Sequence, residues 1–212
     1  MSEIFYYKNL NKNEHLRRVK KVLERGGNII LPTDTIYGII ADAFNEEGVN
    51  NIFKIKKRDK GKKFLILVKS IEEMEKYIDK KNYNKMSKII NLLSKYAVTF
   101  ICKAKENLPE YIVKDGNIAI RIPKVKYLQK LLFYLDNPVV APSANISGEK
   151  DIRWYKDLIK IFSDKVEVIY YKLYLWNIKP STIVDISGNS IDITRKGVDY
   201  KFIKKIIKSI DI

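Results

Sequence analysis

Short runs of β-branched and aromatic residues alternate with amphipathic stretches along the whole chain, and this alternation constrains the fold more than any other feature. Such runs predict strands, and apolar residues at helical spacing predict helices. The predicted strands span residues 4–7, 28–31, 64–68, 97–102, 117–122, 138–141, 166–170, 181–186 and 190–194. The predicted helices lie at 14–25, around 49–56, from 70 onward, and at 84–95, 125–135, 154–162 and 198–209. Because several strands are joined by connections too short for a helical crossover, the sequence predicts an α/β fold with a mixed sheet.

Two helix ends carry local signals. Gly26-Gly27 predicts the end of the first helix, and Ser70 with Glu73 predicts a capping box at the start of another. His15 lies among charged residues near the start of the first helix and is predicted to be solvated. Cys102 ends a predicted strand, and its expected role is that of a small buried apolar residue.

The 212 residues are predicted to form a single domain, residues 1–212, because they contain no internal repeat and no Pro/Gly/Ser-rich linker. Hydrophobic residues make up 46% of the chain, which excludes the disordered class, and no apolar run approaches the ~20 residues of a membrane span. One cysteine and one histidine exclude an internal disulfide framework and a metal site built on several Cys or His ligands. The first ten residues show no secretory signal, so the expected location is the cytoplasm.

The chain has 41 Lys and Arg against 25 Asp and Glu, a formal net charge of +16, which favours anionic partners. Residues 54–63, KIKKRDKGKK, carry seven basic residues and one acidic residue, a local charge of +6 that leaves +10 for the rest of the chain. Lysines with the planar fork of Arg58 suit a polyphosphate, whereas a solvated lysine loop is an equal alternative on composition alone.

Two polar loops follow predicted strands. Residues 31–39, LPTDTIYGI, place three hydroxyl side chains and one carboxylate within five residues, more than a turn requires. Residues 137–148, NPVVAPSANISG, form a small-residue loop whose N–H and hydroxyl groups are able to bind phosphate or carboxylate. Because ligands of α/β sheets bind beyond the carboxyl ends of strands, both loops are candidate site segments.

Arginine is scarce, with seven among the 41 basic residues, and two arginines lie at predicted strand ends. Arg121 lies in the segment AIRIP, and Arg195 lies in the segment ITRKG. The planar guanidinium group of each arginine suits bidentate recognition of a carboxylate or phosphate on a ligand. The alternative is a structural ion pair with a carboxylate such as Asp185.

Six segments, in order and over nearly the whole chain, resemble the signature segments of the YrdC family of threonylcarbamoyl-AMP synthases. They are PTDTIYGI, KKR, AIRIP, APSANISG, PSTIVD and TRKG. The resemblance implies a YrdC-like twisted mixed sheet flanked by helices, with a concave basic cleft. It also implies that ATP, L-threonine and bicarbonate form threonylcarbamoyl adenylate and pyrophosphate, with Mg²⁺ accompanying the nucleotide. Other enzymes then transfer the threonylcarbamoyl group to an adenosine of certain tRNAs, so this machinery is an expected partner.

The resemblance also implies roles for individual residues. Lys56 and Arg58 would be catalytic and hold the triphosphate, and no side chain is implied as a metal ligand. The residues that would bind threonine are Thr35, Arg121, Ala141 and Ser181. The further residues that would contact the nucleotide are Lys62, Asn117, Ser143, Asn145 and Arg195.

The chain departs from the family pattern at several positions. Many relatives have proline and leucine at Lys63 and Phe64, some have histidine at Leu67, and many have Pro-Gly-Pro at 95–97. These departures leave the selectivity for threonine open. Two other functions stay open as well: an RNA-binding module of the same fold, favoured by the +16 charge and 14 tyrosines, and a carbamoyltransferase domain. Weak RNA binding is a further expectation for the enzyme itself.

Overall fold

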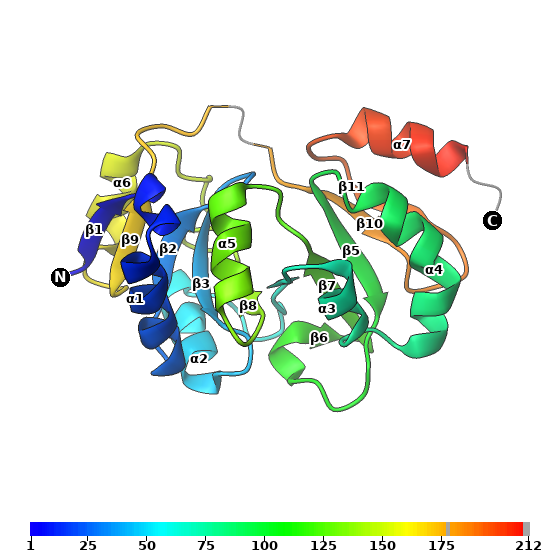
Figure 1. Cartoon of the computed structure of the whole chain (residues 1–212), viewed down its shortest axis with the longest axis horizontal. Coiled ribbons are helices and arrows are strands. Elements are labelled where there is room, and N and C mark those ends of the chain that lie inside the picture. Colours follow the sequence, from blue (N-terminus) through cyan, green and yellow to red (C-terminus); the bar gives the residue numbers. More distant parts are fainter. Residues whose placement is uncertain (177–178, 210–212) are drawn as a thin grey trace.

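A computed structural model describes residues 1–176 and 179–209, and its centre is a mixed, twisted sheet (Figure 1). The strands follow the spatial order β1-β9-β2-β3-β8-β4-β7-β5-β10-β11, and β6 pairs with β7. Their bounds are β1 Glu3–Tyr6, β2 Ile29–Pro32, β3 Tyr37–Asp42, β4 Ile66–Leu67, β5 Val98–Lys103, β6 Val113–Lys114, β7 Asn117–Arg121, β8 Val139–Val140, β9 Val168–Tyr171, β10 Thr182–Asp185 and β11 Asp192–Arg195. The pairs β1–β9, β9–β2, β4–β7 and β5–β10 are parallel and the others antiparallel, which confirms the predicted α/β class with a mixed sheet.

Helices cover both faces of this sheet (Figure 1). Their bounds are α1 Asn13–Glu24, α2 Glu46–Lys56, α3 Ile71–Glu75, α4 Lys80–Leu93, α5 Lys126–Tyr134, α6 Tyr155–Phe162 and α7 Tyr200–Lys208, with short 3₁₀ turns at Tyr7–Asn11 and Glu110–Ile112. The apolar faces of α1 and α5 pack in one core cluster, and those of the other five helices pack in a second. Successive residues of a strand point to opposite faces, so Ile30 of β2 joins one cluster while Ile29 and Leu31 join the other.

Strand β3 is absent from the sequence prediction, which gave 31–39 as strand end and loop. Tyr37–Asp42 pairs with β2 in an antiparallel hairpin whose turn spans residues 33–36. Ile39 and Ala41 pack in one core cluster and Ile40 in the other, so both faces of the strand are buried. Gly38, Ala41 and Asp42 interrupt the run of β-branched and aromatic residues that predicts the other strands.

The predicted end at Gly26-Gly27 and the predicted cap at Ser70 are confirmed, but the Glu73 carboxylate accepts from the Lys69 N–H at 2.7 Å and not from Ser70, so the capping box is half formed. Gly26 has a φ of +78°, its N–H donates to Leu23 and the Gly27 N–H donates to Val22, the paired bonds of a Schellman motif that ends α1. The Ser70 hydroxyl accepts from the Glu73 N–H at 3.2 Å and caps α3. Asp79 caps α4 in the same way at 2.9 Å from the Asn82 N–H, and the helix therefore begins four residues earlier than the sequence predicted.

His15 was predicted to be solvated, and this prediction is wrong. The side chain is 6% exposed, and its Nδ1 lies 3.1 Å from the Tyr170 hydroxyl. The Phe5 ring packs edge-on at 4.6 Å between ring centroids. The first turn of α1 lies against β1 and β9, which buries one side of a helix start that looks polar in sequence. Cys102 is buried as predicted, and burial raises the pKa of its thiol.

We expect the free energy of unfolding to fall as the pH drops from about 7 toward 5.5. Burial lowers the pKa of His15 below its ordinary value of 6.5, so just below that pH the unfolded chain binds more protons than the native one. Chemical denaturation at several pH values measures this slope. His15→Gln, which keeps a hydrogen-bonding group but does not titrate here, should flatten the slope; an equally steep slope in the variant would contradict the assignment.

None of the helices within residues 1–176 and 179–209 combines the length and the apolar character needed to span a membrane.

Candidate active site

A cleft of about 320 Å³ opens where strands from both halves of the sheet end. Its floor is a row of side chains on adjacent strands: Leu67 of β4 pairs with Arg121 of β7, and Ile183 of β10 pairs with both Thr99 of β5 and Arg195 of β11. The walls come from the β2–β3 turn, the loop after β8 and the loop after α2. The register of the sheet therefore brings together residues from five strands that are far apart in the chain.

The Arg121 guanidinium is the most buried cation of the cleft, with 6% of its side chain exposed. Its Nη2 lies 2.6 Å from Asp34 Oδ1, and its Nη1 donates to Thr35 Oγ1 at 3.0 Å. The other Asp34 oxygen accepts from the Lys124 N–H at 3.2 Å. Arg121 Nε is buried and has no acceptor among the residues that the structure describes, so this N–H donor is left unused.

The β2–β3 turn that carries Asp34 and Thr35 is held by Thr33. The Thr33 hydroxyl donates to the Ile36 carbonyl at 2.7 Å and accepts from the N–H groups of Thr35 and Ile36. A hydroxyl that closes its own turn is the local reason for a threonine at this position. The turn therefore presents Thr35 and Asp34 to Arg121 in a fixed orientation.

Lys56 lies behind the cleft and not among its lining residues, and its predicted contact with the triphosphate stays a prediction. The side chain is 1% exposed, and its Nζ donates to three acceptors: the Ser143 carbonyl at 2.5 Å, the Asn145 carbonyl at 2.7 Å and Asn145 Oδ1 at 2.9 Å. Burial, and next the charge of Arg58, lower the pKa of Lys56 to about 8. An ammonium has three donors and all are used here, so Lys56 holds the 143–145 loop as a positioning residue.

Arg58 lines the cleft, and its predicted contact with the triphosphate stays a prediction. Its Nε donates to the Lys62 carbonyl at 3.0 Å and its Nη2 to the Lys63 carbonyl at 2.9 Å, while the guanidinium packs 4.9 Å from the centroid of the Phe64 ring. Burial lowers the pKa of Arg58, yet a guanidinium stays protonated. Nη1 makes no hydrogen bond to any residue in the described part of the chain, so Arg58 both fixes its loop and retains a donor.

Arg195 and Ser181 form a second polar cluster across the floor. Arg195 donates from Nε to the Ser181 carbonyl at 3.0 Å and from Nη2 to the Ser181 hydroxyl at 3.1 Å. The same hydroxyl lies 2.7 Å from Thr99 Oγ1. Partial burial, and next the positive charge of Arg121, lower the pKa of Arg195. An anion between them would relieve this repulsion.

The remaining predicted residues divide into two groups. Ala141 and Ser143 line the cleft, and the Ser143 hydroxyl donates to Asn145 Oδ1 at 2.6 Å behind it. Asn117 shares a face of β7 with Ala119 and Arg121 but begins the strand, roughly 13 Å from Arg121 at about 3.3 Å per residue, outside the hollow. Lys62 is exposed and is also outside it. The nucleotide-binding roles of Asn117 and Lys62 stay predictions.

The lining residues missing from the predicted site include Asp34, Lys63 and Thr99. Asp34 lies within a segment that the sequence did single out, and a buried arginine in need of a counter-charge was the signal for it. Lys63 was noted only as a departure from the family pattern. Thr99 has no local signal, because only the pairing of β5 with β7 and β10 brings it to the floor.

The residues at 1–176 and 179–209 contain no group of three or more His, Cys, Asp or Glu side chains that would hold a metal ion. In the cleft the only carboxylate among the lining residues is Asp34, and it is engaged by Arg121. This donor set does not suit a resident metal.

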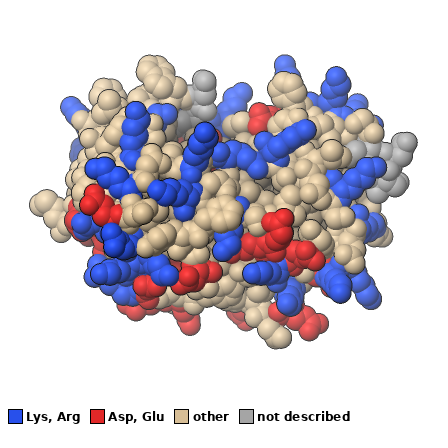
Figure 2. All heavy atoms as spheres, in the orientation of Figure 1, with Lys and Arg blue, Asp and Glu red and all other residues tan. Residues whose placement is uncertain are grey.

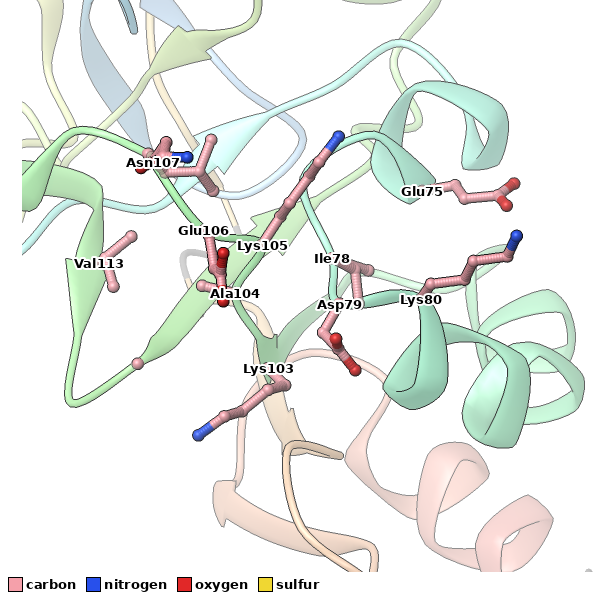
Figure 3. Close-up of a pocket in the computed structure, with 12 residues that line it drawn as sticks. Glu75, Ile78, Asp79, Lys80, Lys103, Ala104, Lys105, Glu106, Asn107 and Val113 are labelled. Carbon is pink, nitrogen blue, oxygen red and sulfur yellow. The ribbon is translucent and has the colours of Figure 1, made fainter.

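A larger hollow of about 1000 Å³ lies at the start of β7, between the end of β5 and the α3–α4 connection. Figure 3 shows that its charged side chains splay apart, with Lys103 and Lys105 extending in opposite directions. Its lining mixes three carboxylates with three lysines, and Asp79 is already engaged as the cap of α4. The convergent cations of the smaller cleft make that cleft the candidate site.

Comparisons with known proteins agree with this fold. The Sua5/YciO/YrdC family model, described as "Telomere recombination", matches residues 21–197. A putative threonylcarbamoyl-AMP synthase of Methanocaldococcus jannaschii is 34% identical over 192 residues, which cover 89% of this chain and 90% of the relative. The structure of P. abyssi Sua5 complexed with L-threonine is 25% identical, with a TM-score of 0.85 over 95% of this chain. YciO of E. coli, 22% identical with a TM-score of 0.78, shares the fold over 93% of this chain and 97% of its own.

The chain spans 59% of the length of that Sua5 chain, although it spans 90% of the M. jannaschii relative.

Proposed function

The chain belongs to the Sua5/YciO/YrdC family, and from this premise we propose that it is a threonylcarbamoyl-AMP synthase. In the proposed reaction L-threonine and bicarbonate form a carbamate, which attacks the α-phosphorus of MgATP to give threonylcarbamoyl adenylate and pyrophosphate. The adenylate would then supply a tRNA-modifying threonylcarbamoyltransferase in the cytoplasm.

One observation carries this proposal: a buried arginine keeps an unused donor beside a hydroxyl and an apolar wall. Arg121 Nε suits the carboxylate of an amino acid, Thr35 lies 3.0 Å from the same guanidinium, and Leu67 lines the cleft with 2% exposure. A carboxylate, a hydroxyl and a methyl group are the features of threonine. L-threonine is also the ligand of the P. abyssi Sua5 complex.

The proposed reaction depends mainly on the positioning of its substrates and on positive charge that stabilises the phosphates. The carbamate oxygen must lie in line with the α-phosphorus while the negative charge of pyrophosphate develops on the leaving side. Arg58 and Arg195 flank the floor with guanidinium groups, and Ser143 adds a hydroxyl at the wall. Fixed donors of this kind stabilise developing charge without reorganisation, so the reaction needs no covalent nucleophile.

The test is a substrate-omission assay that measures pyrophosphate and, by mass, the acyl adenylate. We expect release of pyrophosphate only when MgATP, L-threonine and bicarbonate are all present. Pyrophosphate release without bicarbonate or without threonine would contradict the proposal, and turnover of carbamoyl phosphate would favour a carbamoyltransferase. Substituting serine for threonine in the same assay measures the selectivity that the departures at Lys63, Leu67 and 95–97 leave open.

Arg58→Ala should lower kcat/KM for MgATP by at least about tenfold. A charged hydrogen bond contributes roughly 1.5 kcal/mol or more, and removing it from a phosphoryl transition state lowers the rate accordingly. Arg58→Lys, which keeps the charge without the fork, should lie between the variant and the wild type. Arg17→Ala, on the exposed side of α1, is the matched control, and equal kinetics in the two alanine variants would remove Arg58 from the site.

A further inference from the structure

Lys63 lines the cleft from the loop that follows α2. The backbone around it is held on both sides. The Lys63 carbonyl accepts from Arg58 Nη2 at 2.9 Å, and the N–H of the next residue, Phe64, donates to the Tyr111 carbonyl at 2.8 Å. Phe64 is 2% exposed, and its ring lies 4.9 Å from the Arg58 guanidinium. The base of the Lys63 side chain is therefore fixed in the wall of the cleft, next to Arg58.

Positive charge is widespread on the surface, so charge alone does not distinguish one lysine from another. Figure 2 shows Lys and Arg side chains spread over the face that it draws, with Asp and Glu mainly in its lower half. Of the seven basic residues in 54–63, only Arg58 and Lys63 line the cleft. Lys63 is partly buried, whereas Lys60 and Lys62 in the same loop are exposed. Position in the cleft, and not basicity, separates Lys63 from its neighbours.

The lining of the cleft has four cations and one carboxylate, a net charge of +3, and three of the cations are already anchored. Arg121 is held by Asp34, Arg58 by two loop carbonyls and Arg195 by the serine across the floor. The Lys63 ammonium makes no ion pair or hydrogen bond with any residue of 1–176 or 179–209. It is therefore the cation of the lining that is able to move with a ligand.

We propose that Lys63 is a further phosphate-binding residue, whose ammonium contacts the β- and γ-phosphates of MgATP and stays with them as pyrophosphate leaves. This inference rests on the proposed adenylation. When the carbamate oxygen bonds to the α-phosphorus, the bond from that phosphorus to the α–β bridging oxygen breaks and its electron pair remains on the pyrophosphate. Lys63 keeps its protons throughout and stabilises this charge.

The chemistry of the side chain favours this role. A guanidinium held by carbonyls presents a rigid fork, whereas an ammonium is a compact charge on a flexible four-carbon stem with three rotatable donors. The leaving pyrophosphate moves away from the α-phosphorus, so a flexible cation is able to follow it. The link between the Lys63 carbonyl and Arg58 favours the phosphate side of the cleft over the Arg121 side. Many relatives have proline at this position, so the contact would be particular to this chain.

Equilibrium binding tests the contact without turnover. Calorimetry at about 0.15 M salt, where screening weakens the effect of charges that do not touch the ligand, measures the affinity of the whole protein for magnesium pyrophosphate and for AMP. We expect Lys63→Gln to weaken pyrophosphate binding by about tenfold, the usual effect of losing a charged hydrogen bond, and to leave AMP binding within about twofold. Lys63→Arg, which keeps the charge, should recover most of the pyrophosphate affinity.

Lys60→Gln is the matched control, because it removes the same charge from an exposed position of the same loop. In the pyrophosphate-release assay, Lys63→Gln should lower kcat/KM for MgATP by about tenfold with little change in KM for threonine, and Lys60→Gln should match the wild type.

Three results would overturn the role of Lys63: wild-type protein that does not bind pyrophosphate, equal pyrophosphate affinities of Lys63→Gln and Lys60→Gln, or an equal loss of AMP and pyrophosphate affinity in Lys63→Gln. The last would show a disturbed loop and not a lost contact. The substrate-omission assay on the wild type decides the proposed adenylation separately. A wild type that makes the adenylate while the two glutamine variants behave alike would remove only the role of Lys63.

Discussion

Replacing Arg121 by methionine is expected to lower the free energy of unfolding by about 3–5 kcal/mol, the usual cost of leaving one partner of a buried ion pair alone. The Asp34 side chain is 9% exposed and has its cation 2.6 Å away, so the variant would leave a carboxylate with little access to water. The Thr35 hydroxyl would lose its donor as well. Urea denaturation of the two proteins measures the difference.

The double variant Asp34→Asn with Arg121→Met separates folding from function. It removes the unpaired charge, so most of the lost stability should return. Catalysis should not return, because the proposed contact to the threonine carboxylate is absent, and kcat/KM for threonine should stay about tenfold to hundredfold below wild type. Recovery of activity together with stability would show that Arg121 only supports the fold.

Replacing Lys56 by methionine is expected to cost about 3 kcal/mol of stability or more. Methionine fills a similar volume, but the carbonyls of Ser143 and Asn145 and the Asn145 side chain would all lose a charged donor while they stay buried behind the cleft. Denaturation of the variant measures the loss.

The kinetics of Lys56→Met distinguish a positioning role from a direct one. If Lys56 acts by holding the 143–145 loop, the variant should raise KM for MgATP and increase the susceptibility of that loop to proteolysis. Lys54→Met, at an exposed position of the same helix, is the control and should match the wild type in stability and rate. A Lys56 variant that keeps full stability while losing activity would instead restore the direct phosphate contact predicted from sequence.

Much of the secondary structure was predictable because its signals are local. The apolar stripe of α1 ends at Gly26 and Gly27, whose N–H groups bond to carbonyls within the preceding turn, and Ser70 caps α3 three residues away. Interactions between residues three to five positions apart can be predicted from the local sequence. The segments that line the cleft were also recognisable, since their hydroxyl, small and arginine residues stand out against a background rich in lysine.

The position of each side chain within those segments, buried behind the cleft or lining it, was not predictable from the local sequence. Lys56 and Arg58 are two residues apart in one basic run, yet one is buried behind the cleft and the other lines it. Lys56 is the last residue of α2 and lies on its buried face. Lys57 then adopts the left-handed conformation, with a φ of +49°, which changes the direction of the chain before Arg58. Of the seven basic residues in 54–63, only Arg58 and Lys63 line the cleft.

By itself the sequence determined the alternation of elements, the ends of helices and the segments that carry polar chemistry. Only the tertiary structure decided that Arg121 pairs with Asp34 across 87 residues, that Thr99 joins the floor of the cleft, and that His15 is buried. The physical reason is range. Periodicity and capping act within one turn or strand, whereas burial and charge pairing depend on the register between strands that are distant in the chain.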